Sequence, residues 1–171
     1  MSGELNNELI SKMVEAIDEA NTDVVRALVE KIEDINVKDE RGVPLVLYAA
    51  NTGDVDILEI LILKGAKLNL QDGEGWTALM VAASAGHTNA VSLLLDRGAN
   101  CDITNNGDAT ALMWAASKGF LQIVEMILEK SPAIDLKDKK GSSALMYAVD
   151  GSHVETVKAL LNRGANVCEK D

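Results

Sequence analysis

The feature that most constrains this chain is a repeat of 33 residues. The pair Ala49-Ala50 recurs as Ala82-Ala83, then as Ala115-Ala116, and finally as Ala148-Val149. Other positions keep the same spacing: Gly53, Gly86 and Gly119; Gly65, Gly98 and Gly164; and Asp39, Asp72, Asn105 and Asp138. A period between about 20 and 50 residues is the signature of a repeat architecture. The sequence therefore predicts one structural unit stacked several times.

Each unit is predicted to contain two short helices. Leu79, Ala82 and Ala83 have helical i, i+3, i+4 spacing, and their small size allows a neighbouring helix to approach closely. A second apolar run, residues 91–95, is followed by Gly98, which can end a helix in the left-handed conformation. Helices of about ten residues are not stable alone in water. The units must therefore stack on one another.

The best-preserved unit resembles the ankyrin repeat signature: Asp72-x-x-Gly75-x-Thr77-Ala78-Leu79-Met80-x-Ala82-Ala83-x-x-Gly86-His87, then Leu93-Leu94-x-x-x-Gly98-Ala99-Asn100. Similar copies begin at Asp39, Asn105 and Asp138. The N-terminal stretch fits more loosely and looks like a capping repeat, through Met13, Ala16, Val24, Val25, Leu28 and Asn36. The resemblance implies an all-α solenoid of stacked helix-turn-helix units with short β-hairpin-like finger loops. We expect one domain, 1–171, made of a capping repeat (1–36) and four repeats (37–69, 70–102, 103–135 and 136–171).

The chain departs from the family pattern at the start of the first helix in each repeat. Met80, Met113 and Met146 stand where the family usually has a histidine, and we expect them to pack between repeats. A methionine-lined binding surface is the alternative. Pro44 stands at the position of Thr77, so that helix should form without a capping hydroxyl.

The third and fourth repeats are irregular. Asn105-Asn106-Gly107-Asp108 moves the turn glycine one residue early and predicts a tight Asn-Gly hairpin turn. Ser131-Pro132 replaces Gly-Ala after the second helix of this repeat. The irregularity of the third repeat is either drift or a bent, specialised finger. In the fourth repeat Gly151 precedes the expected glycine position, Ser152. No distinct C-terminal cap is visible, so either the last outer helix is polar enough or that end meets a partner.

We find no motif for catalysis, a cofactor or a metal. His87 and His153 occupy the Gly-His position of the family, which the resemblance implies is structural. Cys101 and Cys168 lack metal or redox spacing and are interpreted as small apolar fillers. The segment Gly73-Glu74-Gly75 lacks the third glycine and the preceding strand of a dinucleotide site. The periodic acids are interpreted as turn-stabilising residues. We therefore expect a non-enzymatic protein with no cofactor and no metal site.

Composition narrows the partner and the compartment. The chain has no apolar run near the ~20 residues that cross a bilayer, and its N-terminus lacks a signal-peptide profile. We expect a soluble cytoplasmic protein that does not engage membranes. A net charge of −11 argues against nucleic acid, and a basic or neutral protein partner is easier to reconcile with it. Residues 1–36 hold nine acids and three bases, which we interpret as a solvated cap face.

In ankyrin proteins the helix face turned away from the stack forms, with the fingers, a concave groove that binds partners. Four of the five aromatic residues map to this groove, and only Phe120 maps to a framework position. Tyrosine and tryptophan are enriched in binding hot spots, although Tyr48, Trp114 and Tyr147 could instead seal the seam between first helices. The predicted contact residues are Arg41, Val43, Tyr48, Thr52, Glu74, Trp76, Val81, Ser84, Asn106, Ala109, Trp114, Lys118, Lys140, Ser142 and Tyr147.

These observations favour a protein–protein interaction module that uses its concave face and fingers. Two alternatives stay open: an acidic, inhibitor- or antitoxin-like protein that neutralises a basic enzyme, and a segment of a longer ankyrin scaffold. We expect a monomer whose weakly capped C-terminal end could self-associate.

Overall fold

The computed structural model of the protein describes residues 2–167. This part of the chain forms ten α-helices, and its one β-type pairing is an isolated bridge between Lys38 and Pro44. The expected all-α solenoid is confirmed. The helices are α1 (Ser2–Asp18), α2 (Thr22–Val29), α3 (Leu45–Thr52), α4 (Val55–Leu63), α5 (Ala78–Ala85), α6 (Thr88–Asp96), α7 (Ala111–Lys118), α8 (Leu121–Glu129), α9 (Ala144–Asp150) and α10 (Val154–Asn162).

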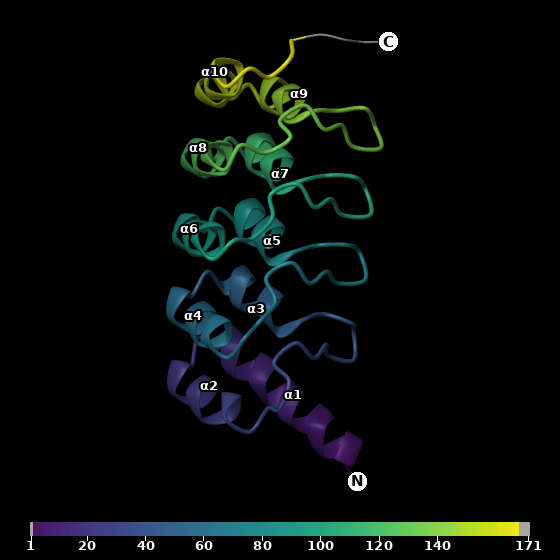
Figure 1. The fold of residues 1–171 in the computed structure, drawn as a ribbon, viewed down its shortest axis with the longest axis vertical. Helices are drawn as coiled ribbons and strands as arrows, with labels where there is room; N and C mark the ends of the chain where they lie inside the picture. The colour runs from purple at the N-terminus through teal and green to yellow at the C-terminus, as the bar shows by residue number, and fades with distance from the viewer. Residues whose placement is uncertain (1, 168–171) are drawn as a thin grey trace.

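The helices form two parallel stacks. The odd-numbered inner helices pack on one another in chain order, and so do the even-numbered outer helices. Four loops project from the inner side of the stack (Figure 1). We call them finger 1 (38–44), finger 2 (71–77), finger 3 (104–110) and finger 4 (137–143). The inner helices and the fingers together form the surface on which the predicted contact residues lie.

Small residues hold the inner helices together. The alanine pairs of α3, α5 and α7 are completely buried, and so is Ala148 of α9. Met80 and Met113 are also buried, which confirms that they pack between repeats, whereas Met146 is only partly buried at the last repeat. Val149, where the earlier repeats have alanine, is 56% exposed because no described repeat covers it.

The starts of the inner helices follow the sequence expectation. The hydroxyls of Thr77, Thr110 and Ser143 each accept a hydrogen bond from a methionine backbone N–H three residues later. Such a cap contributes about 1 kcal/mol. Pro44 begins α3 without a side-chain cap, as predicted.

A glycine and a ring form each junction between interior repeats. Gly53, Gly86 and Gly119 end the inner helices in the left-handed conformation, and a ring of the next repeat lies against each. A Cβ on Gly53 would lie 2.5 Å from the His87 ring, and one on Gly86 would lie 2.9 Å from Phe120. Glycine is therefore required here by backbone conformation and by space.

The terminal repeats relax this requirement. Ala20 and Ser152 take the same left-handed position as the interior glycines. Gly151 does not take it, because it continues the right-handed conformation at the end of α9. Ser131 is likewise left-handed after α8, so Ser131-Pro132 preserves the turn of the other repeats.

A ladder of side-chain acceptors also links the repeats. Asn36 accepts a hydrogen bond from the Lys67 backbone N–H at 2.7 Å, and Asn69 accepts one from the Asn100 N–H at 3.0 Å. The same contact joins Asp102 to Ala133 and Asp135 to Asn166. Each bond spans 31 residues, so every loop is tied to the next repeat.

Helices α1 and α2 form the N-terminal unit. Met13, Ala16, Val25 and Leu28 are buried as expected, but Val24 is 41% exposed, so its assignment to the framework was wrong. Helix α1 has 17 residues, whereas the other inner helices have seven or eight. Its N-terminal part extends toward the side from which the fingers project (Figure 1).

The outer edge of the stack carries ion pairs between consecutive repeats. Glu30 pairs with Lys64, and Asp96 pairs with Lys130 in the same arrangement. Leu63 interrupts this series and is 77% exposed. Arg97, which corresponds to Lys64 and Lys130, pairs with Glu59 instead, at 2.8 Å.

Candidate protein-binding surface

The four fingers share one backbone design. In each, an Asp or Asn at the first turn position accepts hydrogen bonds through Oδ1 from the backbone N–H groups two and four residues later. This confirms the turn-stabilising role expected for Asp39, Asp72 and Asp138. The tight Asn-Gly turn expected in finger 3 is present, because the Asp108 N–H donates to the Asn105 carbonyl at 2.9 Å across Asn106 and Gly107. Asp108, at φ 60°, takes the left-handed position that a glycine takes in the other fingers, and Gly107 does not.

Fingers 2, 3 and 4 are joined near their tips. The Asn106 backbone N–H donates to the Glu74 carbonyl at 2.9 Å, and its side-chain amide donates to the Gly73 carbonyl at 3.0 Å. Lys139 makes the corresponding contacts with finger 3, through its backbone N–H to Gly107 and its ammonium group to the Asn106 carbonyl. The described contact between fingers 1 and 2 lies at their base, from Lys38 to the Gln71 carbonyl. Fingers 2–4 therefore form one connected platform.

The two tyrosines each hold a finger against its inner helix. Tyr48 donates its hydroxyl proton to Asp39 at 2.6 Å, and Tyr147 donates to Asp138 at 2.5 Å. Burial and the hydrogen bond to Asp39 raise the pKa of Tyr48 to about 12. The hydrogen bond to Asp138, with burial, does the same for Tyr147. The tyrosine hydroxyls are thus structural contacts of repeats 1 and 4.

The two aspartates remain ionised despite their partial burial. Burial alone would raise the pKa of Asp138, but hydrogen bonds from Tyr147 and from the Ser142 and Lys140 backbones outweigh it and lower this pKa. The pKa of Asp39 is lowered in the same way, with Arg41 as a further donor. Arg41 also contacts the Tyr48 hydroxyl, so its guanidinium is engaged within the protein.

The two tryptophans meet at the middle of the surface. Trp76 of finger 2 and Trp114 of α7 lie with ring centroids 4.7 Å apart and planes tilted by 32°. Both are partly buried against the core. Among the side chains of residues 7–167, the indole Nε1 of Trp114 is the one buried nitrogen or oxygen with no hydrogen-bond partner. Leaving such a donor unpaired costs about 1–3 kcal/mol.

A hollow of about 170 Å³ lies next to Trp114. Trp114 and Tyr147 are aromatic residues in its lining, and Lys140 of finger 4 is its charged residue. The rest of the lining is small or apolar: Ala109, Met113 and Ser117. The hollow therefore combines apolar rings with a single ammonium group.

The structure places nearly all predicted contact residues at the surface. Ala109 is the exception, because it is only 8% exposed and contributes little beyond the wall of the hollow. The exposed residues are Arg41, Glu74, Asn106, Lys118 and Lys140, and the partly buried ones are Val43, Tyr48, Thr52, Trp76, Val81, Ser84, Trp114, Ser142 and Tyr147.

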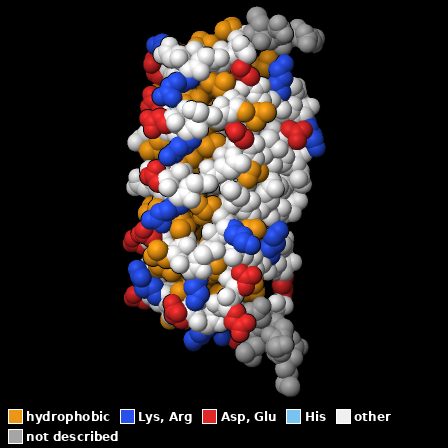
Figure 2. Space-filling model, viewed as in Figure 1, with side chains coloured by type: hydrophobic (Ala, Val, Ile, Leu, Met, Phe, Trp, Pro, Cys, Tyr) orange, Lys and Arg blue, Asp and Glu red, His pale blue; other side chains and the backbone are white. Residues whose placement is uncertain are grey.

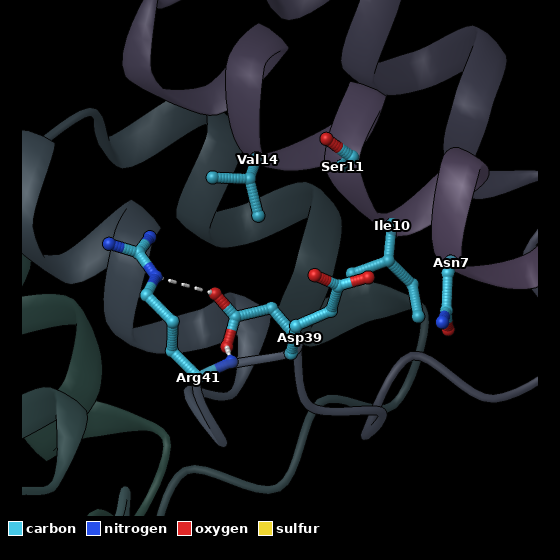
Figure 3. Close-up of a pocket in the computed structure, with 7 residues that line it drawn as sticks. Asn7, Ile10, Ser11, Val14, Asp39 and Arg41 are labelled. Atoms are coloured by element: carbon cyan, nitrogen blue, oxygen red, sulfur yellow. Dashed lines mark hydrogen bonds and ion pairs between the residues drawn. The ribbon is translucent and has the colours of Figure 1, made fainter.

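A second hollow, of about 290 Å³, lies between α1 and finger 1. Figure 3 shows Ile10 and Val14 of α1 on one side and Asp39 and Arg41 of finger 1 on the other. The Arg41 guanidinium is folded back on the Asp39 carboxylate (Figure 3). The charge of Arg41 is thus paired with Asp39 within this hollow. The rest of its lining mixes apolar and polar groups.

The histidines and the described cysteine take structural positions in the fold. His87 and His153 lie at the starts of α6 and α10, and each ring donates from Nε2 to a carbonyl of the previous repeat, Asn51 and Ser117. Cys101 is buried, and burial with the charge of Asp102 raises the pKa of its thiol. Cys168 lies outside the described residues. Where side chains are described, from residue 7 to 167, no His, Cys, Asp or Glu side chains are grouped as metal ligands would be.

The charged side chains are unevenly distributed. Lysines, arginines and acids alternate along the edge formed by the outer helices, on the left of Figure 2, where the ion pairs between repeats lie.

None of the helices in the described part of the chain is both long and apolar enough to span a membrane.

Comparison with known proteins gives one result. The model of the family described as ankyrin repeats (3 copies) matches residues 12–105, 45–138 and 98–171 of this chain. No curated protein matches it.

Proposed function

The chain belongs to the ankyrin repeat family, whose repeats are generally non-enzymatic protein–protein interaction modules, and we propose that it binds a partner protein with Trp76 and Trp114 at the centre of the contact. The surface consists of fingers 2–4 and the exposed faces of α5 and α7. We further propose that the solenoid is divided into its capping repeat and four repeats after residues 36, 69, 102 and 135.

The observation that carries this proposal is the tryptophan pair with its unpaired buried N–H. Tryptophan is among the residues most enriched in binding hot spots, which cluster near the middle of an interface. A buried donor without an acceptor requires an explanation. A partner carbonyl that displaces the Trp76 ring slightly would supply the acceptor and recover the cost of the unpaired group.

The connected fingers support the same location. Hydrogen bonds between fingers 2, 3 and 4 fix their tips before binding. A surface that is already ordered loses less conformational entropy when a partner binds. Tyr48 and Tyr147, in contrast, use their hydroxyls within the protein, so we expect a smaller contribution from each of them.

The test requires a partner isolated on the full chain. Proteins captured from the native organism by wild-type chain are identified by mass spectrometry, and the affinity of each purified candidate is measured by calorimetry. We expect Trp76→Ala and Trp114→Ala each to weaken binding by at least tenfold, because truncating a hot-spot residue costs about 2 kcal/mol or more.

Two further variants separate binding from folding. Ser84→Arg adds bulk to the partly exposed face of α5 without removing a core contact, and it should also weaken binding. Leu63→Ala removes an exposed apolar side chain from the outer edge and should leave affinity unchanged. Partners that bind all three surface variants as tightly as wild type would show that the contact lies elsewhere.

A further inference from the structure

Finger 4 differs in charge from the rest of the protein. It contains Lys137, Lys139 and Lys140 against the single acid Asp138, a net charge of +2. Finger 1 is neutral, finger 2 has a net charge of −2 and finger 3 of −1, in a chain of net charge −11. Finger 4 is therefore a positive region at one end of the proposed surface.

Among the side chains of residues 7–167, no carboxylate lies within 4 Å of the ammonium groups of the three lysines of finger 4. The ion pairs described in the structure use Lys12, Arg41, Lys64, Arg97, Lys130 and Lys158 instead. The Lys139 ammonium donates to the carbonyl of Asn106, which leaves its charge uncompensated. Asp138 already accepts hydrogen bonds at both carboxylate oxygens.

Lys137 and Lys140 face different parts of the molecule. Lys140 lines the hollow beside Trp114 and Tyr147. Lys137 lines another hollow, with Leu145, Val149 and Asp150 at the end of the stack. Lys137 thus shares its hollow with Asp135 and Asp150, whereas Lys140 is the one charged residue that lines the hollow beside Trp114. Lys118, exposed at the end of α7, follows Ser117 of the same hollow.

The size and lining of this hollow fit a short anionic side chain. A volume of about 170 Å³ holds one side chain, and not a whole peptide segment. The rings of Trp114 and Tyr147 would contact its methylene groups, and Lys140 would meet its charge. A basic side chain would be repelled by Lys140 and by the net positive charge of finger 4, because exposed charges interact over about 8 Å at physiological ionic strength.

Resting on the proposed function, we infer that the partner presents an acidic side chain to Lys140 directly beside an apolar residue that contacts Trp76 and Trp114. The bound segment therefore lies along the stack with its acidic end at finger 4. The overall negative charge of the chain favours a basic partner at long range, but the local charge of finger 4 determines which side chain fits at contact distance. A carboxylate and a phosphorylated side chain share this anionic chemistry.

The probe is a random 12-residue peptide library displayed on phage and selected on the immobilised full chain. We expect the enriched peptides to contain an apolar residue within a few positions of Asp or Glu. One such peptide, synthesised with Glu, Gln or phosphoserine at the acidic position, is then titrated at fixed ionic strength. Binding is followed by tryptophan fluorescence, since Trp76 and Trp114 are the only tryptophans in the chain.

The variants Lys140→Glu and Lys137→Glu provide a matched pair, because each makes the same charge change on the same finger. We expect Lys140→Glu to weaken the Glu peptide at least tenfold and Lys137→Glu to weaken it less than threefold. The Gln peptide should bind at least tenfold more weakly than the Glu peptide. The tighter of the Glu and phosphoserine peptides identifies the source of the anion.

The contrary outcomes are distinct. A selection that yields no binder, or binders without an acid, overturns the inference, and so do equal effects of the two lysine variants. Peptides that lose affinity with Trp114→Ala but not with Lys140→Glu, measured by calorimetry, overturn the acidic recognition alone. Peptides that bind Trp114→Ala as tightly as wild type overturn the proposed binding surface as well.

Discussion

Replacing Gly119 by alanine tests why glycine ends the interior helices. Gly119 has a φ of +70°, and a non-glycine residue pays about 1–2 kcal/mol in the left-handed region. An added Cβ would also lie 2.4 Å from Nδ1 of His153. Displacing that ring costs about 1–3 kcal/mol as overpacking. Loss of its 3.1 Å hydrogen bond to the Ser117 carbonyl adds about 1 kcal/mol. We expect a total loss of roughly 3–6 kcal/mol.

Gly65→Ala is the matched control. Gly65 has a φ of +95°, but nothing lies within 4 Å of the Cβ that it would acquire. Only the conformational cost of about 1–2 kcal/mol applies there. Urea-induced unfolding followed by circular dichroism should therefore separate the two variants by about 2–4 kcal/mol, with slopes compared to exclude a change in cooperativity. Equal losses in the two variants would refute the role of the ring.

Three further changes test other features. Tyr147→Phe should reduce the pH dependence of stability. The pKa of Tyr147 is raised from 10 in the unfolded chain to about 12 in the folded protein, so wild type loses this stabilisation as the pH rises from 10 to 12. Urea titrations across that pH range should show a smaller loss of unfolding free energy in the variant. Trp114→Phe removes the unpaired N–H but keeps a ring, so its unfolding free energy should lie within about 1 kcal/mol of wild type. Trp114→Ala should lose about 3–5 kcal/mol. Equal losses in the two variants would contradict the cost assigned to that N–H. Leu63→Glu should place a carboxylate near Arg97 and raise stability by about 0.3–1 kcal/mol in thermal melts, a gain that should vanish in 1 M salt.

The fold followed from the sequence because its determinants recur at a fixed spacing. The period located the helix pairs, and the apolar spacing of Leu79, Ala82 and Ala83 correctly identified the buried face. The structural role of His87 and His153 followed from their shared position. Local conformation was less certain where one residue substitutes for glycine, because Asp108 and Ser152 can also adopt the left-handed conformation. The sequence therefore located the tight turn of finger 3 but not its left-handed residue, Asp108.

The centre of the proposed surface could be predicted from the sequence only in part. The sequence placed Trp76 and Trp114 on the same face, but their mutual contact joins a finger of one repeat to a helix of the next. Ala109, which corresponds to Trp76 in the following finger, lines the hollow beside Tyr147 instead. The tyrosine–aspartate pairs were missed, although a signal was present: Asp and Tyr are nine residues apart in repeats 1 and 4, and only there.

The regular junctions have a consequence for changes in chain length. Because every interior glycine faces a ring 34 residues later, deleting residues 70–102 would bring Gly53 against Phe120 in place of His87, and an equivalent junction would form. Insertion of another 33-residue unit would likewise preserve the junctions. The tryptophan pair is different, because it exists at one junction only. The gain or loss of a repeat could thus leave the fold intact while removing the contact between Trp76 and Trp114.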